Sequence, residues 1–434
     1  MKIVKGFRDI TPFGKNLIEN SSYWNYIASV LKASMSIYNY SEIITPVLEN
    51  TSIFKSGIGS DTDIVSKEMY EFSLKKDDED GLSYCLRPEG TAPIVRSYIE
   101  NSLYKLKKIN KLFYLGPMFR YERSQKGRYR LFHQVGVELL GSNEIYHEIE
   151  VLHLAKDILE RVGIDDYSFQ INTIGDSESL KKISAAIKEL GKKHKQSINK
   201  LDLEILDRNP LRFLDKAIHK YNFENIPKTS DYISKASSKR FDDLKKTLDV
   251  LNFPYKVNDQ LVRGIDYYND FVFEATSSSL GSHDAILAGG RYDQLVENLG
   301  GPPTKAIGFA AGIERMILLL ENQTDKSEES LGLEELDFYV AYQDSKYIEY
   351  SFKIATLLRK NGFKVELEYD SKSFIKQMKT ANKLSCQFVA IIGEDEFKNS
   401  SVRIKIMSSG EEKIVGLDSK FIDVLIEEII SSLS

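Results

Sequence analysis

The sequence predicts a large α+β domain on an antiparallel sheet, a helical insertion within that domain, and a separate C-terminal α/β domain. Residues 111–141 hold two apolar runs with period-two alternation around a charged tip, the pattern of an antiparallel hairpin. Residues 178–256 are lysine-rich and helical in pattern, and residues 321–335 are polar without apolar periodicity, as in a linker. We therefore divide the chain into residues 1–325, with the insertion at 178–256, and residues 334–434.

Composition and charge restrict the class of protein. Hydrophobic residues make up 42% and charged residues 28% of the 434 residues, values typical of a soluble globular chain. The formal net charge is −5, so contact with nucleic acid has to use local basic patches. Cys85 and Cys386 are the only cysteines, which excludes a disulfide framework and favours a reducing cytosol.

Membrane and metal signals are absent from the sequence. The first residues, MKIVKG, hold no apolar signal core, and no run approaches the length of a membrane span. The six histidines show no metal-ligand spacing, and no CxxC string is present. We expect a cytoplasmic protein with no membrane contact and no metal site defined by a side-chain motif.

The hairpin gathers polar side chains on one face. Alternation places Arg120 and Glu122 of the first run, and Gln134 and Glu138 of the second, in a small area of that face. The tip, residues 123–130, carries four cations, a number that suits phosphate groups. The same pattern is also compatible with a wet sheet face and a solvated charge run.

The elements before the hairpin follow from local signals. Residues 13–40 have apolar residues at helical spacing, which predicts an amphipathic helix on the core. Pro46 after a β-branched run indicates a strand at an edge or interface. The string RPEGT at 87–91 predicts a turn that starts a helix, with Thr91 as its cap and Pro93 in its first turn.

The elements after the hairpin alternate between helices and strands. Residues 143–163 predict an amphipathic helix ended by Gly163. Residues 261–274 predict a hairpin with an Asn-Asp turn, and the double glycine within 287–296 allows close backbone approach to a ligand. Residues 306–320 predict a strand, a glycine-containing turn and a helix.

The C-terminal part alternates strand and helix from DFYVAY to VRIKIM, which predicts an α/β unit with parallel strands. No GxGxxG follows a strand, so a dinucleotide-binding domain is not expected.

Several strings resemble the histidyl-tRNA synthetases, a family of class II aminoacyl-tRNA synthetases. FRYERSQKGRYRLFHQVGVELLG, beginning at Phe119, is similar to their motif 2, although Ser124 and Leu131 depart from the usual string. LVRGIDYYNDFVFE and LAGGRYDQLV match two strings specific to the family, and AIGFAAGIERMILLL resembles motif 3. The resemblance implies the class II synthetase fold, an anticodon-binding C-terminal domain, and a homodimer formed through the motif 1 strand near Pro46.

The resemblance also implies a reaction. L-histidine and ATP, with Mg²⁺, form histidyl-adenylate, and the histidyl group is then transferred to the 3′ end of histidine tRNA. Arg120 and Arg263 correspond to the pair at the α-phosphate, and Arg315 to the clamp on the γ-phosphate. Phe132 is expected to stack on adenine, with Glu122 near its amino group.

The remaining implied roles concern histidine and tRNA. Glu138 and Tyr268 are expected to bind the two imidazole nitrogens. The full histidine-binding set implied is Glu89, Thr91, Arg120, Gln134, Glu138, Arg263, Tyr267 and Tyr268. Arg123 and Gln125 are the expected contacts to the tRNA acceptor end, and the lysines of the insertion either face the acceptor arm or are merely solvated.

An alternative from another class is a non-catalytic relative, the histidine-sensing regulatory subunit of ATP phosphoribosyltransferase. That relative keeps the histidine pocket but typically lacks the C-terminal domain and loses the ATP-binding arginines. This chain keeps Arg120, Arg263 and Arg315 together with its last hundred or so residues, which favours the enzyme.

Overall fold

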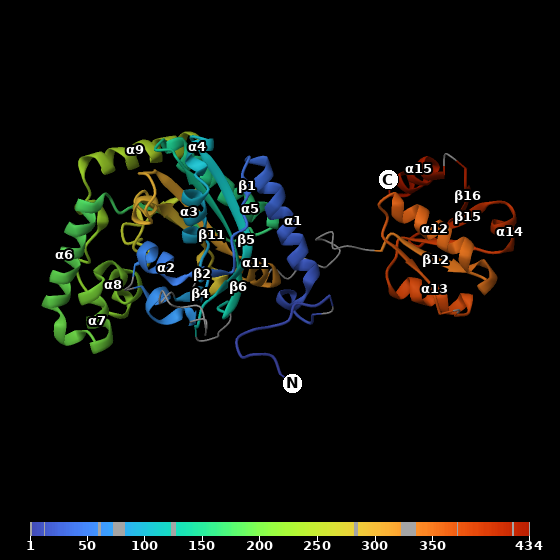
Figure 1. Cartoon of the computed structure of the whole chain (residues 1–434), viewed down its shortest axis with the longest axis horizontal. Helices are drawn as coiled ribbons and strands as arrows, with labels where there is room; N and C mark the ends of the chain where they lie inside the picture. Colours follow the sequence, from blue (N-terminus) through green and yellow to red (C-terminus); the bar gives the residue numbers. More distant parts are fainter. Residues whose placement is uncertain are drawn as a thin grey trace. The chain divides into compact units, whose positions relative to one another are not determined.

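The computed structural model describes residues 2–12, 14–59, 62–72, 83–122, 127–281, 285–322, 336–370, 372–418 and 421–433. The chain forms two compact units, residues 1–326 and 327–434 (Figure 1). Each unit has its own sheet and its own hydrophobic core. The helices of the described residues include none that combines the length and the apolar character needed to cross a membrane.

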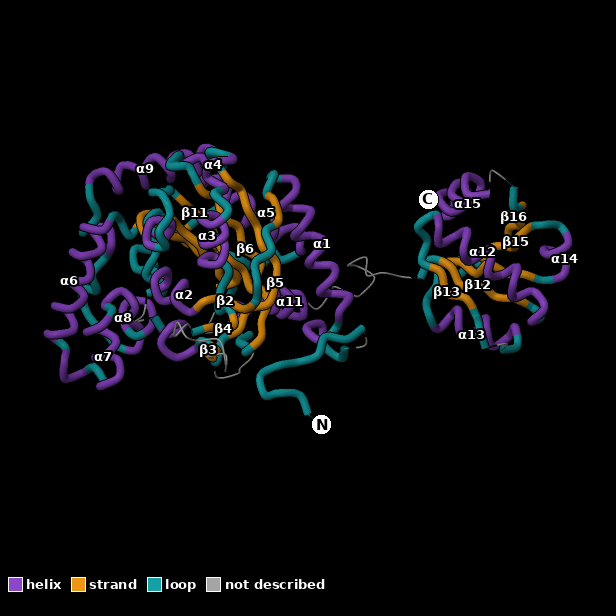
Figure 2. The backbone as a smooth tube through the Cα atoms, in the orientation of Figure 1, coloured by secondary structure: helices purple, strands orange, loops and turns teal. Residues whose placement is uncertain are grey.

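The first unit is built on a sheet that is drawn in orange in Figure 2, where β5, β6 and β11 are labelled. Its described strands follow the order β1-β5-β6-β11-β10-β9-β7-β8. The outermost pairs, β1 with β5 and β8 with β7, are parallel, and every other pair is antiparallel. The predicted α+β fold is confirmed. The strands are β1 (Ser41–Glu42), β5 (Asn110–Phe119), β6 (Leu131–Leu140), β7 (Ser168–Thr173), β8 (Lys256–Val257), β9 (Asn269–Thr276), β10 (Ala285–Arg291) and β11 (Ala306–Gly312).

The predicted hairpin is confirmed as β5 and β6, which pair along their whole length. Val135 and Val137 of β6 lie in the main core, while Gln134 and Glu138 face the opposite side. Strand β1 lies at the sheet edge just before Pro46, as predicted, and Ile44 between them is 85% exposed.

Helices cover both faces of this sheet. The main core is closed by α1 (Ser21–Ile37), α5 (Ile145–Val162), α9 (Lys235–Val250) and α11 (Ile313–Asn322). The other face carries a second apolar cluster with α2 (Thr51–Ile58), α3 (Thr91–Glu100), α4 (Leu103–Leu106) and α10 (Leu295–Asn298). A small sheet of β2 (Leu48–Asn50), β4 (Tyr84–Leu86) and β3 (Tyr70–Phe72) lies at this second face. Helix α5 ends at Gly163, whose φ of 92° suits glycine, as predicted.

The insertion is helical, as predicted, and has its own core. It contains α6 (Ser177–Lys193), α7 (Lys200–Arg208) and α8 (Pro210–Lys216), which share one apolar cluster. Helix α9 falls within the predicted range 178–256 but contributes Phe241, Leu244 and Leu248 to the main core, against α5 and β7. The apolar stripe of α9 therefore belongs to the sheet and not to the insertion.

Two expectations about the later strands are wrong. Residues 261–268 contain no strand, so residues 261–274 form no hairpin, and β9 begins at Asn269. Asp270, with a φ of 48°, exchanges backbone hydrogen bonds with Ile174 and Gly175, so the Asn-Asp pair joins β9 to another segment instead of closing a turn. The double glycine serves strand packing, because a Cβ on Gly289 would lie 2.2 Å from the Gly308 carbonyl oxygen.

The second unit has a five-stranded sheet in the order β13-β12-β14-β15-β16. The α/β prediction holds for β12, β13 and β14, which are parallel, but β15, the VRIKIM run, pairs antiparallel with β14. Residues 393–400 between them are too few for a crossover connection. The elements are β12 (Phe338–Tyr342), α12 (Ile348–Lys360), β13 (Val365–Leu367), α13 (Phe374–Lys383), β14 (Phe388–Ile392), α14 (Glu394–Lys398), β15 (Ser401–Ile406), β16 (Glu412–Gly416) and α15 (Phe421–Leu433).

Some predicted features lie outside the described residues. These are Arg123, Ser124, Gln125 and Lys126 of the hairpin tip, and the predicted linker from residue 323 onward.

Candidate active site

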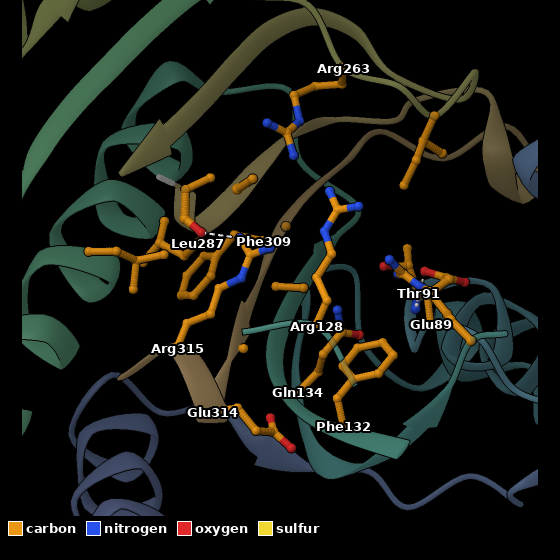
Figure 3. A pocket seen from close by; sticks show the side chains of 18 of the residues that line it. Glu89, Thr91, Arg128, Phe132, Gln134, Arg263, Leu287, Phe309, Glu314 and Arg315 are labelled. Atoms are coloured by element: carbon orange, nitrogen blue, oxygen red, sulfur yellow. Dashed lines mark hydrogen bonds between the residues drawn. The ribbon is translucent and has the colours of Figure 1, made fainter. Parts of the chain in front are cut away.

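A cavity of about 270 Å³ lies on the polar face of the β5–β6 hairpin (Figure 3). Strands β6, β10 and β11, the start of α3, the segment 261–268 and the start of α11 contribute its walls. All sequence-predicted site residues within the described part of the chain line it, although they are far apart in sequence. They are Glu89, Thr91, Arg120, Glu122, Phe132, Gln134, Glu138, Arg263, Tyr267, Tyr268 and Arg315.

The start of α3 supplies two of these groups. The predicted cap is wrong: Gly90 is the N-cap, and the Glu89 carboxylate accepts from the backbone N–H groups of Thr91 (2.9 Å) and Ala92 (2.8 Å). An acidic group at a helix N-terminus is the stronger acceptor for these unpaired donors. The Thr91 hydroxyl is left to donate to Glu138 at 2.7 Å. Pro93 lies in the first turn, as predicted.

Glu138 is the buried acid of the cavity, with 1% exposure. The hydroxyls of Thr91 and Tyr292 donate to its two carboxylate oxygens. Burial raises the pKa of Glu138 to about 8; the two hydroxyl hydrogen bonds oppose this, and the nearby Glu89 carboxylate adds to it. The wall here is close, since a Cβ on Gly308 of β11 would lie 2.1 Å from the Glu138 Oε2.

Tyrosines and an amide complete this end. The rings of Tyr267 and Tyr268 lie 4.8 Å apart, and the Tyr267 ring lies 5.7 Å from that of Tyr292. Burial raises the pKa of Tyr268 to about 12, so its phenol stays protonated near neutral pH. The buried Gln134 Oε1 has no hydrogen-bond partner within the described residues, which leaves an acceptor for a ligand.

The other end of the cavity is cationic. Arg120, Arg128, Arg263 and Arg315 line the cavity. Burial, followed by the like charges of Arg128 and Arg120, lowers the pKa of Arg315. Figure 3 shows Arg263 and Arg315 reaching into the cavity from different walls. The Arg120 guanidinium lies 5.1 Å from the centre of the Phe132 ring. A set of fixed cations beside an aromatic face suits a nucleoside polyphosphate.

Most of these arginines are held by other groups of the site. Arg120 Nε donates to the Pro88 carbonyl at 2.9 Å, and Arg315 donates to the Ala285 carbonyl. Arg263 Nη1 lies 2.8 Å from Glu274, while its buried Nε has no hydrogen-bond partner in the described part of the chain. Fixed donors of this kind need little reorganisation when charge develops on a ligand.

Sequence reasoning missed some lining residues. Tyr292 belongs to the family-specific string LAGGRYDQLV, in which the sequence assigns no role to this tyrosine. Glu314 precedes Arg315, and its carboxylate accepts from Arg8 (2.8 Å) and from the His133 backbone N–H. The available signal for Glu314 was its place next to the expected Arg315, whereas no sequence signal pointed to the Tyr292 hydroxyl. In the described residues, no group of three or more His, Cys, Asp or Glu could hold a metal ion.

Comparisons with known proteins agree with this geometry. The family model of histidyl-tRNA synthetase matches residues 16–316, and that of an anticodon binding domain matches residues 337–428. A histidine–tRNA ligase of Aquifex aeolicus is 40% identical over 416 residues, 95% of this chain and 98% of that protein. One from Dictyoglomus turgidum is 39% identical over 96% of this chain and 98% of its own length. The apo histidyl-tRNA synthetase of S. aureus superposes with a TM-score of 0.78 at 32% identity, with 99% of each chain covered.

The fold, the cavity and these matches define an aminoacyl-tRNA synthetase of class II. Within that class the chain belongs to the histidyl-tRNA synthetase family. The regulatory alternative is less supported, because the similarity to histidine–tRNA ligases spans nearly the full length and includes the anticodon-binding unit.

Proposed function

We propose that the cavity activates histidine with ATP through the residue roles set out below. The enzyme attaches histidine to tRNA, as its family membership implies. The observation that carries the proposal is the polarity of one cavity, which joins a buried acidic and phenolic end to a cluster of arginines.

Activation requires two anions to meet, because the histidine carboxylate attacks the α-phosphate of ATP and pyrophosphate leaves. Arg120 and Arg263 hold the α-phosphate and the carboxylate, and Arg315 holds the γ-phosphate. Their fixed charges stabilise the transition state. The substrate carboxylate is already ionised, so this step needs no general base. Phe132 stacks on adenine, with Glu122 near its amino group.

Histidine lies at the other end of the cavity. Glu138 and Tyr268 bind the imidazole nitrogens, while Glu89, Thr91 and Gln134 hold the α-ammonium group and Tyr267 lines the pocket. The unpaired Gln134 Oε1 and the buried Glu89 carboxylate support this assignment, since a cation needs acceptors. An analogue that lacks one ring nitrogen would leave a buried polar group unpaired.

The residues present fit Mg²⁺ only as an ion carried with ATP. Arginines line the cationic end and Glu122 is assigned to the adenine amino group, so Mg²⁺ would be held by the phosphates of ATP and by water. When bound, Mg²⁺ neutralises charge on the departing pyrophosphate.

The partners follow from the same assignment. Arg123 and Gln125 contact the acceptor end of histidine tRNA, and residues 334–434 read its anticodon. A homodimer forms in the cytoplasm through the strand near Pro46, where the exposure of Ile44 supports an interface. A mass of two chains by light scattering at micromolar concentration is expected, and a monomer would reject this assembly.

The direct test of the function is charging of histidine tRNA with labelled histidine. The enzyme should form histidyl-tRNA only when ATP is present. A folded sample that forms adenylate but no histidyl-tRNA would contradict the transfer step.

A further inference from the structure

The corner between α7 and α8 of the insertion lies against the segment that carries Arg263, Tyr267 and Tyr268. This segment, residues 261–268, has no helix or strand of its own. Leu261 and Val262 are buried in the apolar cluster of the insertion, together with Phe213 and Leu214 of α8. The position of the segment therefore depends on the insertion as well as on the sheet.

Asn209 makes the polar contact at this corner. Its Oδ1 accepts from the Arg212 backbone N–H at 3.0 Å, which caps α8, and its Nδ2 donates to Asp266 Oδ1 at 2.6 Å. Asp266 directly precedes Tyr267, and its carboxylate also packs on Gly59, where a Cβ would lie 2.4 Å from Oδ2. Asp266 is thus held between the insertion and the end of α2.

A second contact from α8 reaches the other side of the same region. Arg212, whose side chain is 8% exposed, forms an ion pair with Asp63. Asp63 precedes the π-helical turn Ile64–Glu68, and the Glu68 carbonyl accepts from the Tyr121 backbone N–H at 2.7 Å. The insertion is therefore connected to the strand end that carries Arg120.

The packing between these contacts is incomplete. A cavity of about 190 Å³ lies between the insertion and the segment. Arg263, Ile265 and Tyr268 line both this cavity and the active-site cavity, and so form the wall between them. Asp215 of α8 adds to the acidic surroundings of Arg263: burial lowers the pKa of Arg263, but Glu274, then Tyr268 and Asp215, raise it overall. Because apolar packing is interrupted here, polar contacts at the cavity edge hold the wall in place.

We propose that Asn209 is a positioning residue for histidine binding, acting through Asp266 on the segment that carries Arg263, Tyr267 and Tyr268. This inference rests on the proposed roles of those three residues.

The test uses the full-length enzyme and ATP–pyrophosphate exchange at varied histidine and ATP. Asn209→Ser keeps a capping oxygen but is too short to reach Asp266, and Asp266→Ala removes the acceptor. Asn199→Ser is the matched control, since Asn199 caps α7 and donates to Tyr221 and Asp202 within the insertion.

Asn209→Ser and Asp266→Ala should each raise the KM for histidine about 3- to 10-fold, the effect of one ordinary hydrogen bond, because the Asn209–Asp266 contact is exposed to solvent. The KM for ATP should change less than the KM for histidine, because Arg263 is the only one of the segment's three site residues that is assigned to ATP as well. Both KM values should stay at wild type in Asn199→Ser. The double variant should raise the KM for histidine no further than Asp266→Ala alone, because Asn209 acts through Asp266, whose carboxylate also packs on Gly59. Multiplicative effects, or a wild-type KM for both single variants, would overturn the inference. Absence of histidine-dependent exchange in the wild type would instead refute the proposed function.

Discussion

Glu138 shows how burial sets the chemistry of a single residue in this cavity. Alternation along β6 predicted its position, and the structure places its two oxygens against the Thr91 and Tyr292 hydroxyls. The sequence could not predict Tyr292, because its contact with Glu138 depends on the distance between strands that are not adjacent in sequence. The sequence predicts Thr91 as the cap of a helix, but the Glu89 carboxylate makes the capping contacts.

Arg263 and Glu138 should separate catalysis from binding. Arg263→Ala should slow adenylation by raising its activation barrier by roughly 2–4 kcal/mol, as for the loss of a preorganised transition-state donor. Glu138→Gln should raise the KM for histidine more than it lowers kcat, since Glu138 recognises histidine in the ground state. Steady-state exchange kinetics measure both. Equal losses of histidine affinity and rate in Arg263→Ala would make Arg263 only a wall of the pocket.

The raised pKa of Glu138 predicts a pH window for histidine binding. The window lies between pH about 6.5, the ordinary pKa of an imidazole, and pH about 8, the pKa of Glu138. In this range Glu138 of the free enzyme is protonated and the imidazole of free histidine is neutral. The carboxyl and the imidazole therefore share one proton when histidine binds. Below this window histidine has to lose a proton, and above it the carboxylate has to gain one, so affinity falls on both sides. Calorimetry of histidine binding across this range measures the window.

Glu138→Gln is the control for that window. It should keep the acid limb, which belongs to histidine, and lose the limb near pH 8. An affinity of the wild type that rises steadily through pH 8 would contradict the assignment of a shared proton.

At the scale of elements, strands with strong alternation were predictable and connecting segments were not. The β5–β6 hairpin followed from its pattern, whereas residues 261–268 hold their place through burial of Leu261 and Val262 in the insertion core. The antiparallel β15 was missed because its apolar pattern is the same in either direction. The predicted insertion, residues 178–256, includes helix α9 because charge pattern does not reveal which core a helix joins.

Strand β11 offers a test of the close pairing that forms the cavity wall. Gly308→Ala should destabilise the first unit by about 3 kcal/mol, because its Cβ would meet the Glu138 carboxylate and the Val137 carbonyl at 2.1 and 2.2 Å. Gly312→Ala in the same strand is the control, since its Cβ meets only ordinary contacts at 3.7 Å or more. Thermal unfolding measures both, and equal melting temperatures would contradict the close approach.

At the scale of the molecule, the sequence predicted two folding units, because a polar stretch separates two sets of apolar patterns. The structure forms compact units of residues 1–326 and 327–434. The described residues assigned to adenylation lie in the first unit. The tRNA contacts of Arg123 and Gln125 stay proposals.

A chain that ends near Glu321 should separate the two activities. It should still form histidyl-adenylate, provided that the dimer survives, but should charge tRNA poorly because the anticodon contacts are lost. The loss should appear mainly as weaker tRNA binding, since those contacts are remote from the reacting atoms. Exchange and aminoacylation rates of the truncated chain measure this. Full charging at low tRNA concentration, or loss of exchange from a folded dimer, would contradict the division.

The central claim is that one cavity selects histidine and activates it with ATP. ATP–pyrophosphate exchange by the full-length chain, run with each of the twenty amino acids in turn, tests it most directly. We predict exchange with histidine and with no other amino acid, because Glu138 and Tyr268 match the two imidazole nitrogens and the arginines match the triphosphate. Exchange with a different amino acid, or no exchange with any from a folded sample, would contradict the account.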